Sequence, residues 1–553
     1  MSIYPLFKLD TLNGFISLGI VFFSLLTVIY SSRFMKGKPH LAQYYGCIFL
    51  TALAALGAAL ANNLILLLVC WGFLGPTLYL LINLGGSGSG AAAKKSLIIV
   101  GGSDALMLFG IGIIYCLTGS FQMDKIRISL TPAYYLTAIA YISIAVACFA
   151  KAGLAPFHSW VPDCAQSAPL PVAAYVLASL DKLLGIYLLA RISLNLFIMN
   201  KAMNILLMLM GALTIIAAVM MALVQHNMKR LLGYHAVSQV GYMVLGIGTG
   251  NPIGIAGGLF HMLNNAIYKH CLFLASGNVE FRAKSTELDE LGGLAKGMPL
   301  TYISALVASL SISGVPPFCG FFSKWMIYQG LLQQWQVESY LLKAVSILCL
   351  VAAMFGSVLT LASFMKLLHA VFLGQQRNND STKQRINEVE WQMWLPCLVL
   401  AVICIIFGVF ARQIPLHYFI LPAIRGVSFI GTWQAGLSTL LIIISLVLGF
   451  LLLCLKWARP LVRQDTAFIG GELIDLEETR VTGTEFYNSV KEFWILKDIY
   501  KGAERGLFDI YEQAKIIVFG LGKFFQNLHN GVLPTYLAWT LLGMMYLFWA
   551  FLR

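Results

Sequence analysis

The sequence predicts an all-α protein that crosses a membrane many times. Of its 553 residues, 59% are hydrophobic and only 11% are charged. That is too few charged side chains to cover a soluble protein of this length. Apolar runs of about 20 residues, the length that an α-helix needs to cross a bilayer, recur along the whole chain. Few stretches alternate as a β-strand does, so we expect about 14 transmembrane helices.

The predicted spans follow one another with short polar connections. They cover residues 13–33, 43–61, 63–84, 96–118, 134–153, 170–191, 203–225, 231–250, 254–276, 299–336 (interrupted), 343–372, 394–411, 434–456 and 534–552. Basic clusters lie between them, and such clusters orient membrane helices by the excess of Lys and Arg on the cytoplasmic side. The formal charge of +13 therefore does not predict nucleic acid as a partner. We expect flexible connections at 85–96 and 374–385.

The composition divides the chain into three parts. Residues 1–456 form the predicted bundle, residues 457–530 are polar, and residues 531–553 hold the last apolar run. We expect an amphipathic helix over about 491–527 that lies along the membrane surface and is anchored by the last span. This helix would suit a strap across neighbouring subunits, and a solvated tail is the alternative. We expect no cleaved signal peptide, because the first apolar run begins late and has no cleavage site.

The eleven cysteines are scattered singly, and no CxxC pair occurs. This pattern argues against an iron–sulfur cluster or a structural zinc ion in this chain. Small apolar packing is the expected role of these side chains. We accordingly expect no metal site and no cofactor in this chain.

Ionisable side chains lie inside several predicted spans. A charge at the centre of a bilayer costs roughly 2.5–3.5 kcal/mol, so such residues persist only where they face water, a partner or a pathway. His261, Asn265 and Lys269 are spaced i, i+4 and i+8, on one face of a helix. A polar stripe favours a hydrated proton path over unrelated core histidines. The candidate pathway residues are Asp104, Lys151, Asp181, Lys182, Lys229, His261, Asn265, Lys269, His270 and Lys324.

Proline interrupts one predicted helix near residue 316. Pro316 and Pro317 remove two backbone donors and stop the helix, Gly320 follows them, and Lys324 comes four residues later. Carbonyl groups freed at membrane depth are tolerated only inside protein or around water. We therefore expect a hydrated cavity beside Lys324.

A second break is predicted where Lys151 is followed by Gly153 and Pro156. Here the lysine precedes the proline, whereas in the other break it follows. The reversed order is what an inverted-topology repeat would give, and such repeats place ion sites at discontinuous helices near the midplane. The alternative is a simple proline kink with a snorkelling lysine.

Four stretches resemble the large antiporter-like subunits of complex I, of energy-converting membrane-bound hydrogenases and of Mrp cation/proton antiporters. They read KAGLAPFHSWVPDCAQSAPLPV, HNMKRLLGYHAVSQVGYM, HMLNNAIYKHCLFLASG and SGVPPFCGFFSK. The similarity runs from about residue 5 to 373. From 457 onward there is only a loose similarity to hydrogenase-type relatives.

The resemblance implies roles for the lysines of the first half of the chain. Lys151 corresponds to the lysine before the first broken-helix proline. Lys182 corresponds to the bridging lysine on the next helix. Lys229 matches the lysine of a Lys-Arg pair after the following span.

In the second half, His261 and Lys269 match the polar residues of the family's central axis. Asn265 stands where some members have a second histidine, and Lys324 matches the terminal lysine at the second break. Asp104 looks like an aspartate that some members carry on the span after the family's key glutamate.

The chain departs from the family at two points. The key glutamate, the usual partner of the first lysine, would fall at Gly72, and no glutamate precedes Glu280. We expect Asp104 or Asp181 to replace it. The first predicted span looks like the family's third helix, so a neighbouring subunit or lipid would cover the surface of the first two.

The resemblance leaves four functions open. The first is a proton- or sodium-translocating, non-redox subunit of a redox-driven complex, with antiporter-like and quinone- or hydrogenase-module subunits as partners. Its redox cofactors would lie in those partners, since this chain shows no haem, flavin, nucleotide or cluster motif. The others are an Mrp-type antiporter subunit, a subunit of an inorganic-carbon uptake pair, and a scaffold whose proton path is lost. The expected location is a bacterial or archaeal cytoplasmic membrane.

Overall fold

The structure is a computed structural model that describes residues 6–86, 88–131, 134–336, 339–374, 386–424, 426–429, 434–454 and 483–552. Almost all of these residues are helical, and β-structure is limited to a two-residue parallel pair, β1 (Ile128–Ser129) with β2 (Phe197–Ile198). In the described ranges nine helices are long and apolar enough to cross a membrane, or ten if a bent C-terminal pair is one span. The prediction of an all-α membrane protein is confirmed.

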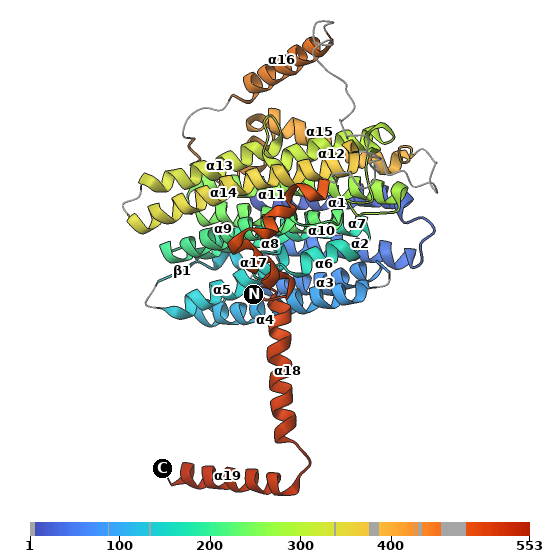
Figure 1. Ribbon diagram of the computed structural model, residues 1–553. Helices are drawn as coiled ribbons and strands as arrows, with labels where there is room; N and C mark the ends of the chain where they lie inside the picture. Colours follow the sequence, from blue (N-terminus) through green and yellow to red (C-terminus); the bar gives the residue numbers. More distant parts are fainter. Residues whose placement is uncertain are drawn as a thin grey trace. The chain divides into compact units, whose positions relative to one another are not determined.

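A helix occupies each predicted apolar run, and the main ones lie side by side in Figure 1. The first half contains α1 (Thr11–Phe34), α2 (Leu41–Leu60), α3 (Leu64–Asn83), α4 (Ser89–Thr118), η1 (Met123–Lys125), α5 (Tyr135–Ala152), α6 (Trp160–Ser167), α7 (Leu170–Val172), η2 (Ala173–Leu180), α8 (Asp181–Arg191), η3 (Ile192–Leu196), α9 (Lys201–Leu223) and α10 (Met228–Gly248). The second half contains α11 (Pro252–Ala283), η4 (Leu294–Lys296), α12 (Pro299–Ser313), α13 (Cys319–Gln333), η5 (Gln334–Gln336), α14 (Tyr340–Leu368), η6 (His369–Leu373), α15 (Trp391–Val409), η7 (Arg412–Ile420), α16 (Ala435–Cys454) and η9 (Gly483–Glu492).

Two local features differ from the prediction. The connection expected at 85–96 is mostly helix, because α4 begins at Ser89. Three consecutive alanines, 91–93, lie in its first turns, and alanine is the strongest helix former. The span over 170–196 is not a regular α-helix, since η2 is a π-helix. Residues 375–385, also expected to be a connection, lie outside the described residues.

Helices α10 and α11 are at the centre of the bundle. Nearly every residue of α10 and every residue from Ile253 to Val279 of α11 is buried, as expected of helices enclosed on all sides. Glycines let these backbones touch directly. A Cβ added to Gly211 of α9 would lie 2.7 Å from the carbonyl oxygen of Gly241 in α10. Helices α9, α10 and α11 therefore pack backbone to backbone, and the bundle positions its side chains around them.

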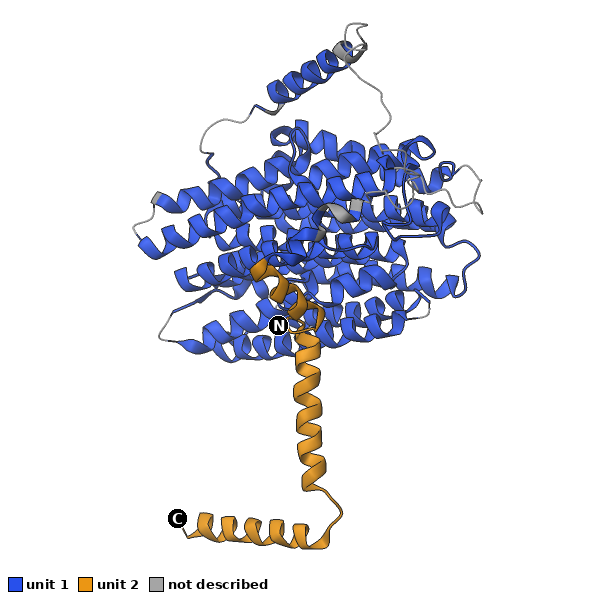
Figure 2. Cartoon of the chain, viewed as in Figure 1, with its two compact units in different colours: residues 1–493 blue, residues 494–553 orange. Residues whose placement is uncertain are grey.

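The C-terminal residues form a separate compact unit (Figure 2), which covers 494–553. It contains α17 (Trp494–Glu504), α18 (Ile510–Leu528) and α19 (Leu533–Phe551), and α18 and α19 meet at an angle of 98°. The amphipathic stretch expected over 491–527 is thus divided into α17 and α18 by a turn at 505–509. Most of the predicted polar segment, 457–482, lies outside the described residues.

Candidate functional site

The first helix break buries an ion pair. α5 ends at Ala152, and Gly153 follows in the left-handed conformation, with φ of 80°. Lys151, in the last turn of α5, places its Nζ atom 3.5 Å from Oδ1 of Asp181 at the start of α8, and both side chains are buried. Two charges at this depth are tolerated only when they are paired or hydrated. The break therefore contains the kind of group that can hold or release a proton.

Lys182 completes this cluster. A Cβ added to Gly153 would lie 3.4 Å from the Nζ atom of Lys182, so the ammonium group faces the break. It lies 5.7 Å from the ring of Trp160. The Nζ atom of Lys182 and Oδ2 of Asp181 are buried with no hydrogen-bond partner among the described residues. Buried polar atoms of this kind are usually bonded to ordered water.

A second carboxylate approaches Lys151 through an aromatic side chain. The indole Nε1 of Trp71 donates a 2.9 Å hydrogen bond to Oδ1 of Asp104. The Nζ atom of Lys151 lies 5.7 Å from the Trp71 ring. Gly72, where the resemblance places a glutamate, has open space around its missing Cβ atom. Asp181 thus contacts Lys151 directly, whereas Asp104 is linked to it by Trp71.

His261 on α11 is held by polar neighbours on two other helices. Its Nδ1 atom lies 2.9 Å from the hydroxyl of Ser323, and its Nε2 atom lies 3.0 Å from Oε1 of Gln239. The Tyr268 hydroxyl is 3.3 Å from the same Nε2 atom. The ring of Tyr242 is 5.4 Å from the imidazole. His261 therefore joins α10 to α13, immediately beside the second helix break.

The other two members of the α11 stripe face other partners. Asn265 donates a 3.4 Å hydrogen bond to the carbonyl oxygen of Ala178 in η2. Lys269 donates a 2.7 Å hydrogen bond to the carbonyl oxygen of Leu232 in α10. The stripe thus connects the two breaks along α11.

At the second break α12 ends at Ser313, and Gly314 follows with φ of 82°. Lys324 on α13 donates a 2.9 Å hydrogen bond to the carbonyl oxygen of Ile312, and its Nζ atom is 4.6 Å from the Tyr242 ring. The ammonium thereby satisfies a carbonyl group at the end of α12.

Gly314, rather than the prolines, ends α12, and Pro316 and Pro317 follow in the turn. Gly320 was predicted to belong to the break, but it is the second residue of α13. A Cβ at this position would collide with the carbonyl oxygen of Ser311. Gly320 therefore allows a close backbone approach.

The buried ionisable side chains between the two breaks form a row, which consists of Lys151, Asp181, Lys182, Lys269, His261 and Lys324. Two candidate residues lie apart from this row. His270 has both ring nitrogens engaged, with Nδ1 2.8 Å from the Ser179 hydroxyl and Nε2 3.4 Å from the Thr27 hydroxyl. Lys229 lies in the first turn of α10 and pairs with the partly exposed Glu280 at 3.3 Å. The structure therefore does not bring these two side chains into the row.

Several side chains at the site escaped the sequence analysis. Trp71, Gln239 and Ser323 contact predicted residues directly, but their types are common in helices and carry no signal of their own. His235 and Lys366 are also buried in apolar helices. They could have been found by the same criterion as the other ionisable residues.

Unpaired polar atoms gather around the same helices. The buried atoms with no hydrogen-bond partner among the described residues include Lys151 Nζ, Asp181 Oδ2, Lys182 Nζ, His235 Nδ1, Gln239 Nε2, Asn264 Oδ1 and Asn265 Oδ1. Because native proteins rarely leave such atoms unsatisfied, each is a natural position for a water molecule. Chemically, alternating ionisable groups and water can relay protons.

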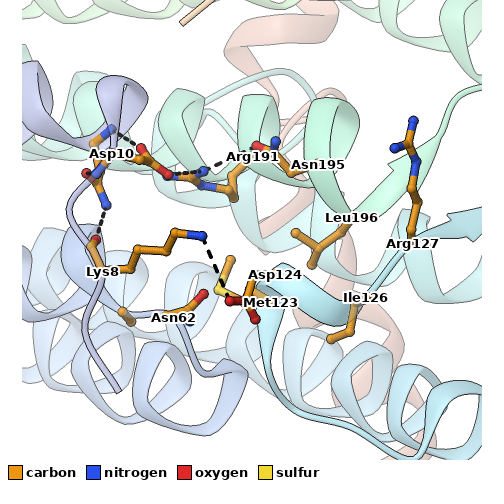
Figure 3. A pocket seen from close by; sticks show the side chains of 12 residues that line it. Lys8, Asp10, Asn62, Met123, Asp124, Ile126, Arg127, Arg191, Asn195 and Leu196 are labelled. Carbon is orange, nitrogen blue, oxygen red and sulfur yellow. Dashed lines mark hydrogen bonds and ion pairs between the residues drawn. The ribbon is translucent and has the colours of Figure 1, made fainter. Parts of the chain in front are cut away.

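A polar cavity of about 300 Å³ lies elsewhere, next to the start of α1 (Figure 3). Arg191 donates hydrogen bonds of 2.7 and 2.9 Å to Asp10, and the Nζ atom of Lys8 lies 3.8 Å from Asp124. None of the predicted pathway residues lines this cavity. We therefore do not assign it to the row.

Asp10 also caps α1, since its carboxylate accepts hydrogen bonds from the backbone N–H groups of Leu12 and Asn13. Burial raises the pKa of this carboxyl group. The hydrogen bonds and charge of Arg191, with the two backbone donors, outweigh burial and hold the pKa below its usual value.

Buried charges, two interrupted helices and a surrounding helical bundle define a polytopic membrane protein with an ionisable core. The chain belongs to the NADH:quinone oxidoreductase/Mrp antiporter transmembrane family, which matches residues 61–360.

Two curated relatives illustrate this membership. NADH-quinone oxidoreductase subunit N of Desulforudis audaxviator is 31% identical over 425 residues, which cover 73% of this chain and 82% of the relative. Na(+)/H(+) antiporter subunit A1 of Staphylococcus haemolyticus is 28% identical over 515 residues, which cover 88% of this chain. The match spans only 62% of the length of that antiporter subunit.

Two solved structures share the fold. One is the membrane-bound sulfane sulfur reductase (MBS), an archaeal respiratory membrane complex, with a TM-score of 0.80 and 23% identity, covering all of this chain and 90% of that chain. The other is the Mrp complex from Dietzia sp. DQ12-45-1b, with a TM-score of 0.68 and 22% identity, covering 75% of this chain and 84% of that chain.

Proposed function

We propose that this chain is a proton-translocating membrane subunit of a multi-subunit, redox-driven ion pump of the complex I-like or membrane-bound hydrogenase-like kind. Its redox cofactors lie in partner subunits, and sodium is the alternative ion. The similarity to a quinone oxidoreductase subunit over 73% of the chain supports this choice. The buried row of ionisable groups is what such a subunit needs.

The observation that carries the proposal is the Lys151–Asp181 pair at the first break. The buried ammonium and the carboxylate lie 3.5 Å apart, so each compensates the charge of the other inside the bundle. Moving the carboxylate away leaves an unpaired charge in a medium of low dielectric constant, which is unfavourable. The pair can therefore convert a small displacement into proton transfer.

The row gives that proton a route. Lys182 faces the first break, Lys269 and His261 lie along α11, and Lys324 faces the second break. Asp104, held by Trp71, supplies a further carboxylate near the first lysine. Protons move between groups that are joined by hydrogen bonds. Side chains about one helical turn apart therefore need water between them, and water bound at the unpaired polar atoms fills these intervals.

The proposal includes a finer topology. Helices α10, α11, α16 and α19 and the α12–α13 pair add five spans to the nine that hydropathy identifies, which makes 14. The two breaks belong to an inverted repeat within 1–456. Residues 457–530 and 531–553 form the lateral segment and its anchor, which contact other membrane subunits and lipid. The membrane is the cytoplasmic membrane of a bacterium or archaeon.

A cation/proton antiporter subunit is the second candidate. The match to Na(+)/H(+) antiporter subunit A1 covers 88% of this chain, more than the match to the oxidoreductase subunit covers. Both functions would use the same buried lysines. Identifying the chains that copurify with this protein would distinguish them, since redox subunits are expected only in the first case.

Proton flux through the intact assembly tests the proposal. The assembly is purified from its native host through a tag on this chain and placed in liposomes that contain a pH-sensitive dye. A potassium gradient with valinomycin then sets the membrane potential. We expect Lys151→Ala and Lys324→Ala each to lower proton flux at least about tenfold, as loss of an acid–base group does.

The exposed Lys36→Ala variant is the control and should keep the original flux. Unchanged flux in both buried-lysine variants, with normal assembly of the complex, would contradict the proposed function.

A further inference from the structure

His235 on α10 is a buried titratable residue that the row does not use. Lys269 donates its hydrogen bond to Leu232, which precedes His235 by one helical turn. The ring of Phe364 lies 4.6 Å from the imidazole of His235 and 5.8 Å from the Nζ atom of Lys269. His235 and Lys269 thus share a neighbour and line the same part of the core.

On its other side His235 contacts α14. Its Nε2 atom lies 2.7 Å from the hydroxyl of Ser363, and both residues are fully buried. Ser363 and Lys366 are three residues apart, on one face of α14. The Nζ atom of Lys366 donates 2.7 Å hydrogen bonds to the carbonyl oxygens of Leu223 and Gln225, at the end of α9.

This line of side chains reaches the surface of the compact unit formed by residues 1–493. Gln225 is partly exposed, and the next residue, His226, is exposed. The Nδ1 atom of His226 lies 3.0 Å from a carboxylate oxygen of Asp289, so acid–base groups stand at the outer end. A series of polar groups therefore runs from the buried Lys269 to solvent.

The Nδ1 atom of His235 is placed to bind a water molecule. Nδ1 is buried and has no hydrogen-bond partner among the described residues. A water molecule is the usual partner of such an atom. The charged side chains that act on His235 from the helices around it are all basic: Lys269 on α11, Lys324 on α13 and Lys366 on α14.

We propose that His235 carries protons between Lys269 and the surface at Gln225 and His226, by way of Ser363 and water beside Lys366. This inference rests on the proposed function and adds a branch to the row. A proton from water reaches Nδ1 and forms the imidazolium. The Nε2 proton then passes to the Ser363 hydroxyl, whose own proton leaves to water near Lys366.

The cycle closes without a net change. After the transfer the imidazole is neutral and carries its proton on Nδ1, and rotation of the ring, which presents a protonated nitrogen to Ser363 again, restores the starting arrangement with one proton moved outward. The Ser363 hydroxyl rotates to accept again. No bond other than O–H and N–H bonds forms or breaks.

The test uses the liposome assay on the intact assembly. His235→Gln keeps an amide that can bond to Ser363 but cannot take up a proton. Ser363→Ala keeps the imidazole and removes its outward partner, and its small change of volume protects against failure to fold. The exposed His417→Gln is the matched control.

We expect His235→Gln to lower proton flux about tenfold and Ser363→Ala to lower it severalfold, as loss of an acid–base relay does. His417→Gln should have no effect. Flux in His235→Gln should also depend less steeply on pH than flux in the original protein, because an amide cannot take up a proton. A merely structural histidine would leave that profile unchanged.

Normal flux and an unaltered pH profile in both variants would overturn the branch, provided that Lys324→Ala still blocks transport. If Lys324→Ala also leaves flux unchanged, the proposed function itself fails, and the branch fails with it.

Discussion

Replacing Asp181 by asparagine leaves the ammonium of Lys151 without its counter-charge inside the bundle. The two groups are 3.5 Å apart, and both are buried. With an effective dielectric constant of about 20, Coulomb's law gives an attraction of roughly 5 kcal/mol at that distance. Removing one partner of a buried pair costs about 3–5 kcal/mol, because the surviving charge stays buried. We expect Asp181→Asn to lower the free energy of unfolding by that amount.

A double-mutant cycle measures the coupling. Lys151→Met should cost less than Asp181→Asn, because the neighbouring residue Lys182 still supplies a positive charge near Asp181. The double variant buries neither charge of the pair and should be at least as stable as Asp181→Asn. The assay is thermal unfolding of the purified assembly with a thiol-reactive dye, since eight of the described cysteines are buried and free. If the losses of the single variants simply add in the double variant, the two side chains do not interact and the reasoning fails.

The same assay checks three further predictions. Because the pKa of Asp10 is lowered in the folded protein, its stabilising effect is present above pH 3.8 and is lost as the pH falls through the folded-state value. Asp10→Asn should therefore cost about 1.5–3 kcal/mol near neutral pH and progressively less in acid, and a constant difference would contradict this. Gly72→Ala should be neutral or stabilising by up to about 1 kcal/mol, because its missing Cβ atom has open space around it. Gly211→Ala should cost about 1–3 kcal/mol, because the new Cβ atom would lie 2.7 Å from the Gly241 carbonyl oxygen; equal effects of the two alanines would contradict the packing argument.

The positions of the helices follow from the sequence because the thickness of a bilayer sets the length of an apolar run. The predicted run 13–33 and the observed Thr11–Phe34 differ only at the ends. The start of α4 at Ser89 was missed because its glycines and serines have the composition of a loop. The π-helix over Ala173–Leu180 was missed because a π turn has no hydrophobic period distinct from that of an α-helix over eight residues.

The candidate site could be predicted in its residue types but not in its pairings. Each buried lysine is conspicuous in an apolar helix. The partner of Lys151 lies 30 positions away on another helix, so spacing alone left Asp104 and Asp181 as equal alternatives. Only the three-dimensional packing distinguishes direct contact at 3.5 Å from a link through Trp71. Likewise, sequence spacing cannot show that His235 of α10 meets Ser363 of α14.

The glycine contacts between α9, α10 and α11 limit how this protein can move. With Gly211 packed on Gly241, and Gly246 packed on Gly258, sliding or tilting one helix would drive backbone atoms into one another. These three helices therefore behave as one rigid block during any transport cycle. A signal that crosses the block must travel as a shift of charge or a change of side-chain rotamer, and distances between their backbones should stay constant throughout turnover.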